Sequence, residues 1–270
     1  MDVFSADWLG ICRRIVDAHR AIFAEVRGVA ARTAYEGVGK GGDRTLVIDR
    51  RCEDAVFAEL EALAAQGASF VAISEERGEV SFGDGGSAHV VIDPIDGSLN
   101  ARRTLPAHSL SIAVASGRSM ADIEFGYVFD FGAGEEFAAA RGEGAKLDGE
   151  PIEVGADGEM LELLGVESAE PERALPSLEA LAGCVYRLRV VGSIAITAAY
   201  VAADRFDAML SLRPCRSVDA AAAQLIVREA GGLVAFGDLA PADALLGLDA
   251  RYPIAAAAGE LGMAIARSAQ

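Results

Sequence analysis

The sequence predicts a mixed α/β protein with two lobes, and three observations lead to this fold class. Apolar residues recur at helical spacing from about residue 7 to 32, which predicts a long amphipathic helix. Segments such as 89–92 are short and rich in β-branched residues, as buried strands are. Beyond about residue 150 the elements become shorter and alternate between helix and strand. We therefore expect an N-terminal α+β lobe over 1–155 and a C-terminal α/β lobe over 156–270.

The remaining elements follow the same periodicities in order along the chain. In the first lobe the patterns predict a β-like segment at 45–49, a helix at 52–63, strands at 70–73, 89–92, 110–114, 123–130 and 135–140, and a hairpin loop at 141–150. In the second lobe they predict strands at 160–166, 185–191 and 206–212, and helices at 175–181, from about 194, and at 219–230 before two glycines.

Composition and charge exclude several classes of function. The chain of 270 residues is 52% hydrophobic, and its 41 acidic against 24 basic residues give a net charge of −17. Nucleic-acid binding requires excess Lys and Arg, so we expect no such partner. The longest apolar run, 190–203, is too short to span a bilayer, and the N-terminus lacks the basic start of a signal peptide. The four cysteines form no CxxC pair. We expect a cytoplasmic protein without membrane contact.

A glycine-rich segment precedes the second predicted helix. Gly37, Gly39 and Gly42 match a dinucleotide-binding GxGxxG spacing by letter. That motif follows a strand and opens a helix, whereas here a helix precedes it and a β-like segment follows. We interpret the segment as a mobile loop.

The most informative segment is Asp93-Pro94-Ile95-Asp96-Gly97-Ser98-Leu99-Asn100, directly after a hydrophobic strand. Taken alone, Asp-Pro-x-Asp-Gly is also a competent structural turn. Two carboxylates around a Pro-stiffened turn can equally converge on a hard cation. The following Gly97 and Ser98 could then start a helix whose backbone N–H groups face a phosphate.

Three further acidic residues lie at element ends. Glu75 and Glu76 follow the strand at 70–73, where acidic side chains are usually solvated. Asp219 opens a helix, where its ordinary role is capping. Binding sites in α/β proteins nevertheless lie at such ends, so these carboxylates are candidate ligands.

Together these motifs resemble the inositol monophosphatase family, within the superfamily that includes fructose-1,6-bisphosphatases and phosphoadenosine phosphatases. The resemblance spans about residues 40 to 235. Asp93 to Asn100 is similar to the family's DPIDG[TS]xN signature, and Ser74-Glu75-Glu76 to its SEE motif. Ser217 to Ala221 with the later Glu-Ala-Gly-Gly is similar to its WDxAA…EAGG motif. The resemblance implies a layered αβαβα sandwich and a homodimer.

The resemblance also implies roles for individual residues, with two or three Mg²⁺ ions as cofactors and Mn²⁺ as a substitute. One ion would be held by Glu75, Asp93 and the carbonyl of Ile95, and a second by Asp93, Asp96 and Asp219. Glu75 and Ser98 would orient the attacking water, and the N–H groups of Gly97 and Ser98 would bind phosphate. Gly192 and Ser193 would belong to the substrate loop. Asp49 would help to bind a weaker metal.

Departures from the family pattern concern the substrate. Leu212 stands where members devoted to inositol monophosphate usually have a Glu, and Arg213 and Arg216 lie nearby. This Arg-containing version resembles the broader-specificity branch, which also accepts fructose 1,6-bisphosphate. An Arg could bind a second phosphate bidentately. Either Arg could equally be a surface residue. We expect hydrolysis of inositol 1-phosphate, with fructose-1,6-bisphosphatase activity as the alternative.

Two other functions remain open. A glycosidase also uses paired carboxylates, but without a metal ion. A sugar-phosphate-binding paralogue on the same fold would bind without catalysis. His19, His89 and His108 have no zinc-site spacing, and we find no GxSxG nucleophile motif.

Overall fold

The computed structural model describes residues 1–38, 44–156 and 158–270. Its helices are α1 (Trp8–Glu25), α2 (Val29–Arg32), α3 (Val47–Ala65), α4 (Ser98–Arg102), α5 (Pro171–Leu181), α6 (Ile194–Ala202), α7 (Ser217–Glu229) and α8 (Glu260–Ser268), with 3₁₀ turns at Val3–Ser5 and Met120–Asp122. The strands of the first half are β1 (Tyr35–Val38), β2 (Arg44–Leu46), β3 (Phe70–Ser74), β4 (Gly78–Phe82), β5 (His89–Asp96), β6 (Ser109–Ala115), β7 (Ile123–Asp130), β8 (Glu135–Ala140), β9 (Ala145–Leu147) and β10 (Glu150–Ile152). Those of the second half are β11 (Leu161–Glu167), β12 (Val185–Arg189), β13 (Ala208–Ser211), β14 (Cys215–Arg216), β15 (Leu233–Phe236), β16 (Arg251–Tyr252) and β17 (Ile254–Ala257).

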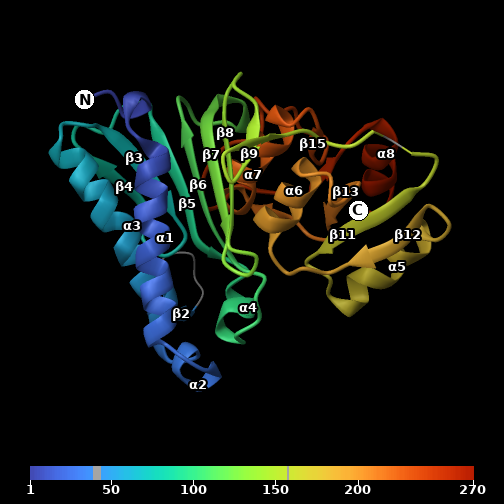
Figure 1. The fold of residues 1–270 in the computed structure, drawn as a ribbon, viewed down its shortest axis with the longest axis horizontal. Helices are drawn as coiled ribbons and strands as arrows, with labels where there is room; N and C mark the ends of the chain where they lie inside the picture. The colour runs from blue at the N-terminus through green and yellow to red at the C-terminus, as the bar shows by residue number, and fades with distance from the viewer. Residues whose placement is uncertain (39–43, 157) are drawn as a thin grey trace.

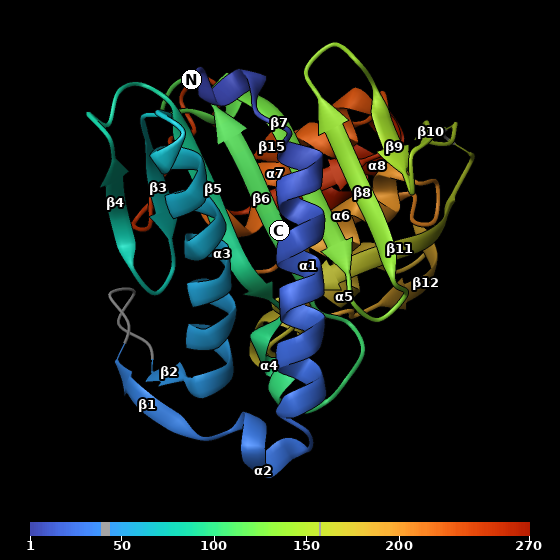
Figure 2. The ribbon, with the colours of Figure 1, turned by 60° about the vertical axis from the view of Figure 1, so that its left-hand side comes forward.

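These elements form five layers (Figure 1). Helices α1 and α3 lie side by side on one face of a large sheet, as Figure 2 shows. Helices α6 and α7 fill the space between this sheet and a smaller one, and α5 and α8 cover the far face of the smaller sheet. The mixed α/β class and the α-β-α-β-α layering that we expected are confirmed.

The larger sheet has eight strands in the order β10-β9-β8-β7-β6-β5-β3-β4, and only β3 and β5 pair in parallel. The smaller sheet has the order β12-β11-β13-β17-β15, with β11 parallel to both of its neighbours. Every residue of β5 is buried, and its pairing with β6 is irregular between Asp93 and Asp96. The sheets lie on either side of about residue 155, but the division into two domains stays a prediction.

Helix α7 packs unusually close to the larger sheet because the contact is made by small residues. Residues 220–223 of the helix are all alanine and all buried. Opposite them, a Cβ on Gly126 of β7 would lie only 2.6 Å from the Ala222 carbonyl oxygen, so only glycine fits there. This contact brings α7, which carries Asp219 in its first turn, directly against the larger sheet.

Three predicted elements differ from the structure. The hairpin loop expected over 141–150 contains β9 and the first residue of β10. The helix expected over 7–32 is interrupted after Glu25, because Gly28 has φ of 80° and α2 follows as a separate turn. The β-like segment at 45–49 is wrong from Val47 onward, where α3 already begins. Asp49 therefore lies in the first turn of a helix and not at the end of a strand.

Two further predictions concern the glycine-rich segment and membrane spans. The ends of the glycine-rich segment are strands and not loop, because Gly37 belongs to β1 and pairs with Thr45 of β2. Gly39 and Gly42 lie outside the described residues, so the loop interpretation is not tested there. Within the described residues, no helix is both long and apolar enough to cross a membrane.

Candidate active site

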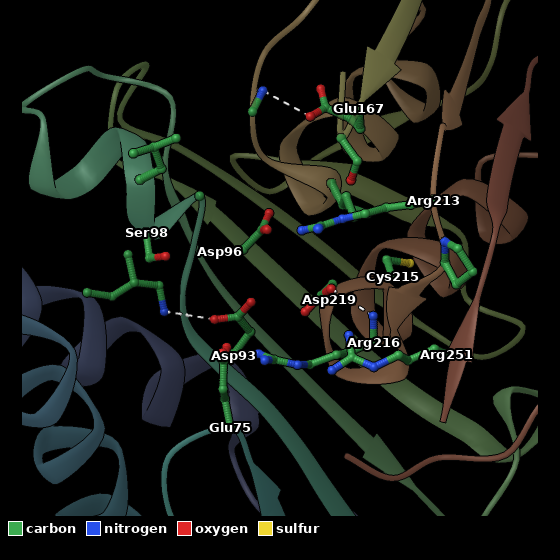
Figure 3. Close-up of a pocket in the computed structure, with 17 residues that line it drawn as sticks. Glu75, Asp93, Asp96, Ser98, Glu167, Arg213, Cys215, Arg216, Asp219 and Arg251 are labelled. Atoms are coloured by element: carbon green, nitrogen blue, oxygen red, sulfur yellow. Dashed lines mark hydrogen bonds and ion pairs between the residues drawn. The ribbon is translucent and has the colours of Figure 1, made fainter. Parts of the chain in front are cut away.

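A cavity of about 370 Å³ opens where the end of β5, the start of α4 and the start of α7 meet (Figure 3). It lies between residues of the larger sheet and loops of the smaller one. Its lining residues are Glu75, Asp93, Ile95, Asp96, Gly97, Ser98, Leu99, Glu167, Ser168, Gly192, Ile194, Arg213, Pro214, Cys215, Arg216, Asp219 and Arg251. Ten of the residues that we assigned from sequence are among them, whereas Asp49 and Ser193 are not.

The irregular end of β5 aims two carboxylates into this cavity. The backbone N–H of Ile95 donates to Asp93 Oδ1 at 3.0 Å, which fixes the turn between the two aspartates. Gly97 then adopts φ of 83° at the start of α4. A Cβ on Gly97 would lie 2.9 Å from the Ala107 carbonyl oxygen and 3.0 Å from that of Gly192, so glycine is required by both conformation and space.

Asp96 is held by the start of α6 as well as by its own strand. Its Oδ2 accepts hydrogen bonds from the Ser193 hydroxyl, the Ala195 N–H at 2.8 Å and the Ser109 hydroxyl at 3.4 Å. Ser193 is the N-cap of α6 and also accepts from the Ile196 N–H at 3.2 Å. Ser193 thus contributes to the site by orienting Asp96 from behind the cavity wall.

Asp219 approaches from the opposite side, in the first turn of α7. The helix begins two residues earlier than expected, with Arg216 as its N-cap, so Asp219 is not the cap itself. Its Oδ2 instead accepts from the Arg216 N–H at 2.9 Å, as the third helical residue of a capping box does. Burial and the nearby charge of Asp96 raise its pKa to about 7. Burial, together with Asp96 and Asp219, raises the pKa of Asp93 as well. Three aspartates therefore share one small region in which their negative charges repel each other.

Glu75 occupies the turn after β3, and its carboxylate forms an ion pair with the Arg216 guanidinium. The turn itself is fixed from α3, because the buried Glu53 carboxylate accepts from the Ser74 hydroxyl and from the Arg77 N–H at 3.1 Å. Figure 3 shows Glu75 directed from below toward Asp93 and Arg216.

A smaller cavity of about 30 Å³ joins Asp49 to the same cluster, together with Glu75, Glu76, Asp93, Pro94, Ile95 and Ser98. The Asp49 Oδ1 atom is buried and has no hydrogen-bond partner among the described residues. Burial and the charge of Glu76 raise the pKa of Asp49 to about 7. A buried carboxylate oxygen without a donor is a candidate ligand for a cation.

The donor set fits a hard divalent cation. Carboxylate oxygens and a backbone carbonyl are the ligands that Mg²⁺ prefers, and a cation would relieve the repulsion that raises these pKa values. Among the described residues, no three His, Cys, Asp or Glu side chains lie together closely enough to hold one metal ion as they stand. The fit therefore rests on the chemistry and orientation of the carboxylates, and binding requires small movements of their side chains.

The wall of the cavity formed by Glu167, Arg213, Arg216 and Arg251 contains two residues that the sequence analysis did not select, Glu167 and Arg251. Glu167 ends β11 and is buried; its carboxylate accepts from the Thr197 hydroxyl at 2.7 Å and from the N–H groups of Val191 at 3.2 Å and Gly192 at 2.9 Å. Burial raises its pKa to about 7. The rule that drew attention to Glu75, an acid directly after a strand, would also have identified Glu167.

The arginines of this wall differ from one another. The Arg213 side chain is 57% exposed and pairs with Glu170 at 3.2 Å. The Arg216 side chain is 12% exposed and lies toward the carboxylates. Arg251, which the sequence analysis did not select, is the register partner of Arg216 across β14 and β16. Leu212 is buried in the core behind the wall and does not line the cavity.

Comparisons with known proteins agree with this architecture. The family described as "Inositol monophosphatase family" matches residues 13–270. A protein of Methanothermobacter thermautotrophicus named fructose-1,6-bisphosphatase/inositol-1-monophosphatase is 30% identical over 93% of this chain and 91% of its own length. A Haemophilus influenzae protein named Nus factor SuhB is 33% identical over 75% of this chain and 76% of its own.

Among solved structures, the crystal structure of an inositol monophosphatase-fructose 1,6 bisphosphatase is similar to this fold with a TM-score of 0.85. It is 25% identical in sequence and covers 98% of this chain and 100% of its own.

Proposed function

Since the chain belongs to the inositol monophosphatase family, we propose that it is a Mg²⁺-dependent phosphatase of small polyol or sugar phosphates. The observation that supports this most is the convergence of Asp93, Asp96 and Asp219 on one cavity from segments far apart in the sequence. Their raised pKa values indicate a place where positive charge is favourable.

In this proposal the metal ions are held at the end of the cavity that carries the carboxylates of Asp93, Asp96 and Asp219, which we call the floor. The ligands would be Asp93, Asp96, Asp219, Glu75 and the Ile95 carbonyl, with Asp49 at a weaker third position. The bound ions supply an acidified water and neutralise the charge of the phosphate.

The protein's own groups position the reactants. Ser98 and Glu75 orient the attacking water from the side of α4 and β3. The backbone N–H groups of Gly97 and Ser98 bind the phosphate. Gly192 contributes the facing backbone of the substrate loop, and Ser193 holds Asp96 in place.

We propose inositol 1-phosphate as the principal substrate and fructose 1,6-bisphosphate as a second one. The bisphosphate is suggested by the name of the Methanothermobacter relative and by the arginines in the cavity wall. Of the two arginines left open by the sequence, we assign the second phosphate to Arg213, because its side chain is exposed at the wall. We also propose a homodimer, on the family resemblance alone.

A phosphate-release assay tests this function. Purified protein should release inorganic phosphate from inositol 1-phosphate in millimolar Mg²⁺, and EDTA should abolish the release. Fructose 1,6-bisphosphate should also be hydrolysed. EDTA-resistant cleavage of a glycoside would instead support the glycosidase, and binding of both phosphates without turnover would support the non-catalytic paralogue.

A further inference from the structure

The strongest unexplained contact is the ion pair between Arg216 and Glu75, since it places a positive side chain among the proposed metal ligands. The two residues come from opposite sides of the cavity, one from β14 and the other from the turn after β3. Their side chains are only 12% and 25% exposed, so water screens this pair less than the exposed pair of Arg213 and Glu170.

Each partner is anchored independently of the pair. On one side, the Arg216 backbone N–H donates to Asp219, and β14 is paired with β16. On the other side, Glu53 fixes the turn that carries Glu75 through Ser74 and Arg77. The contact is therefore a product of the fold on both sides, and not the chance meeting of two flexible surface side chains.

We propose that Arg216 is an internal counter-cation that competes with a divalent metal ion for Glu75. The proposal rests on the metal site of the proposed function. The guanidinium offsets part of the repulsion between Glu75 and the three aspartates when no metal ion is bound. A divalent ion that binds Glu75 competes with this guanidinium for the carboxylate, and the like charge of the guanidinium opposes the ion. Arg216 is thus a positioning residue that weakens metal affinity and supports the metal-free protein.

Metal affinity gives the first test. Mg²⁺ binding by isothermal titration calorimetry should be about tenfold tighter in Arg216→Ala than in the wild type, the size expected for removal of one hydrogen-bonded charge. The matched control is Arg213→Ala, which removes an exposed arginine of the same wall and should change the dissociation constant less than twofold. Arg216→Lys keeps the charge and should lie nearer the wild type.

Stability in EDTA gives a second test that needs no metal. Arg216→Ala should lower the melting temperature, and the loss should be much smaller in a Glu75→Gln background, where the carboxylate charge is already absent. If Arg216→Ala does not fold, Arg216→Gln replaces it in both experiments. Equal losses in the two backgrounds would mean that Arg216 supports the fold through other contacts and would overturn the proposal.

The outcomes separate this inference from the proposed function. Wild-type protein that binds no Mg²⁺ would overturn both the metal site and the competition. If the wild type binds Mg²⁺ but Arg216→Ala binds it equally well or more weakly, the competition alone is overturned. The phosphatase proposal would then stand.

Discussion

The two ends of the cavity are built differently. At the carboxylate end, Asp93 and Asp96 are buried and are held by hydrogen bonds from their own turn and from the start of α6. At the arginine wall, Arg213 is exposed and forms an ion pair with the exposed Glu170, three residues after the end of β11. The first arrangement holds the carboxylate atoms in defined positions, and the second tolerates changes of side chain.

In the proposed function, this difference would separate the residues of the reaction from those that select the substrate. A rigid, charged floor can support one type of phosphate chemistry, because preorganised charge lowers the barrier for that step. An exposed wall on loops can differ in sequence without disturbing the floor. If this is correct, substitutions on the floor should affect turnover with every substrate, whereas substitutions on the wall should affect only some substrates.

The largest effect should come from Asp96→Asn. The amide has nearly the same shape but no charge, so one proposed metal ligand is lost while the fold is kept. We expect turnover to fall at least about 10²-fold on all substrates, the size typical of losing one preorganised electrostatic group. Circular dichroism should show an unchanged fold. More than about a tenth of wild-type turnover at saturating Mg²⁺ would place Asp96 outside the catalytic machinery.

Glu167 differs from the exposed Arg213 on the wall, because it is buried and has a raised pKa. Glu167→Gln tests whether this part of the wall is held in place. The pKa of this carboxyl rises from 4.5 to about 7 on folding. Its contribution to stability is therefore complete below pH 4.5 and is lost as the pH rises through about 7. The free energy of unfolding of the wild type relative to the variant should decrease between pH 5 and pH 8, by about 2–3 kcal/mol.

Urea unfolding in EDTA at several pH values measures this difference, since Gln cannot titrate. Any constant offset between the two proteins reflects the altered hydrogen bonds to Val191, Gly192 and Thr197. A difference that does not vary with pH would show that Glu167 titrates normally and that the wall is uniformly adaptable.

Gly97→Ala tests the backbone conformation at the floor of the cavity, and Gly134→Ala is its control. Both glycines have positive φ, 83° and 76°, but only Gly97 has carbonyl oxygens within 3.0 Å of the added Cβ. Thermal unfolding should show a loss of about 1–3 kcal/mol for Gly97→Ala, since strain and steric overlap add. The control should lose about 1 kcal/mol, from strain alone. Equal losses would show that the α4 start can adjust to a side chain.

The smallest effect is expected from Arg213→Ala. Its exposed side chain should contribute about 1 kcal/mol to binding a second phosphate, or about fivefold in kcat/KM for fructose 1,6-bisphosphate. Hydrolysis of inositol 1-phosphate should be unchanged. Equal losses on the two substrates would show that Arg213 acts generally, and the separation between floor and wall would then be wrong.

The carboxylate end was predictable because its residues lie in continuous motifs. The turn from Asp93 to Ser98 follows a strand that β-branched residues specify, and Pro94 and Gly97 limit its conformations. Asp49 was placed correctly near the cluster but in the wrong element. The β-branched residues before it predicted a strand, whereas Ile48 and Cys52 are buried one helical turn apart and extend the apolar face of α3.

The wall was less predictable because it depends on pairing between distant segments. Glu167 reaches the cavity because β11 pairs in parallel with β13, which sets Glu167 beside Ser211. The ion pair of Arg216 with Glu75 likewise joins residues from opposite sides of the cavity. No local periodicity specifies such contacts, since each depends on the register of a sheet or on the packing of two layers.

The long-range hydrogen bonds of Asp96 have a consequence for folding kinetics. Its partners Ser193 and Ala195 are 97 and 99 residues away along the chain, so the floor of the cavity is complete only after α6 has docked on the larger sheet. A transition state that lacks this docking offers a metal ion no complete site. Mg²⁺ should therefore prolong the lifetime of the native protein by slowing its unfolding, while the rate of refolding stays nearly the same.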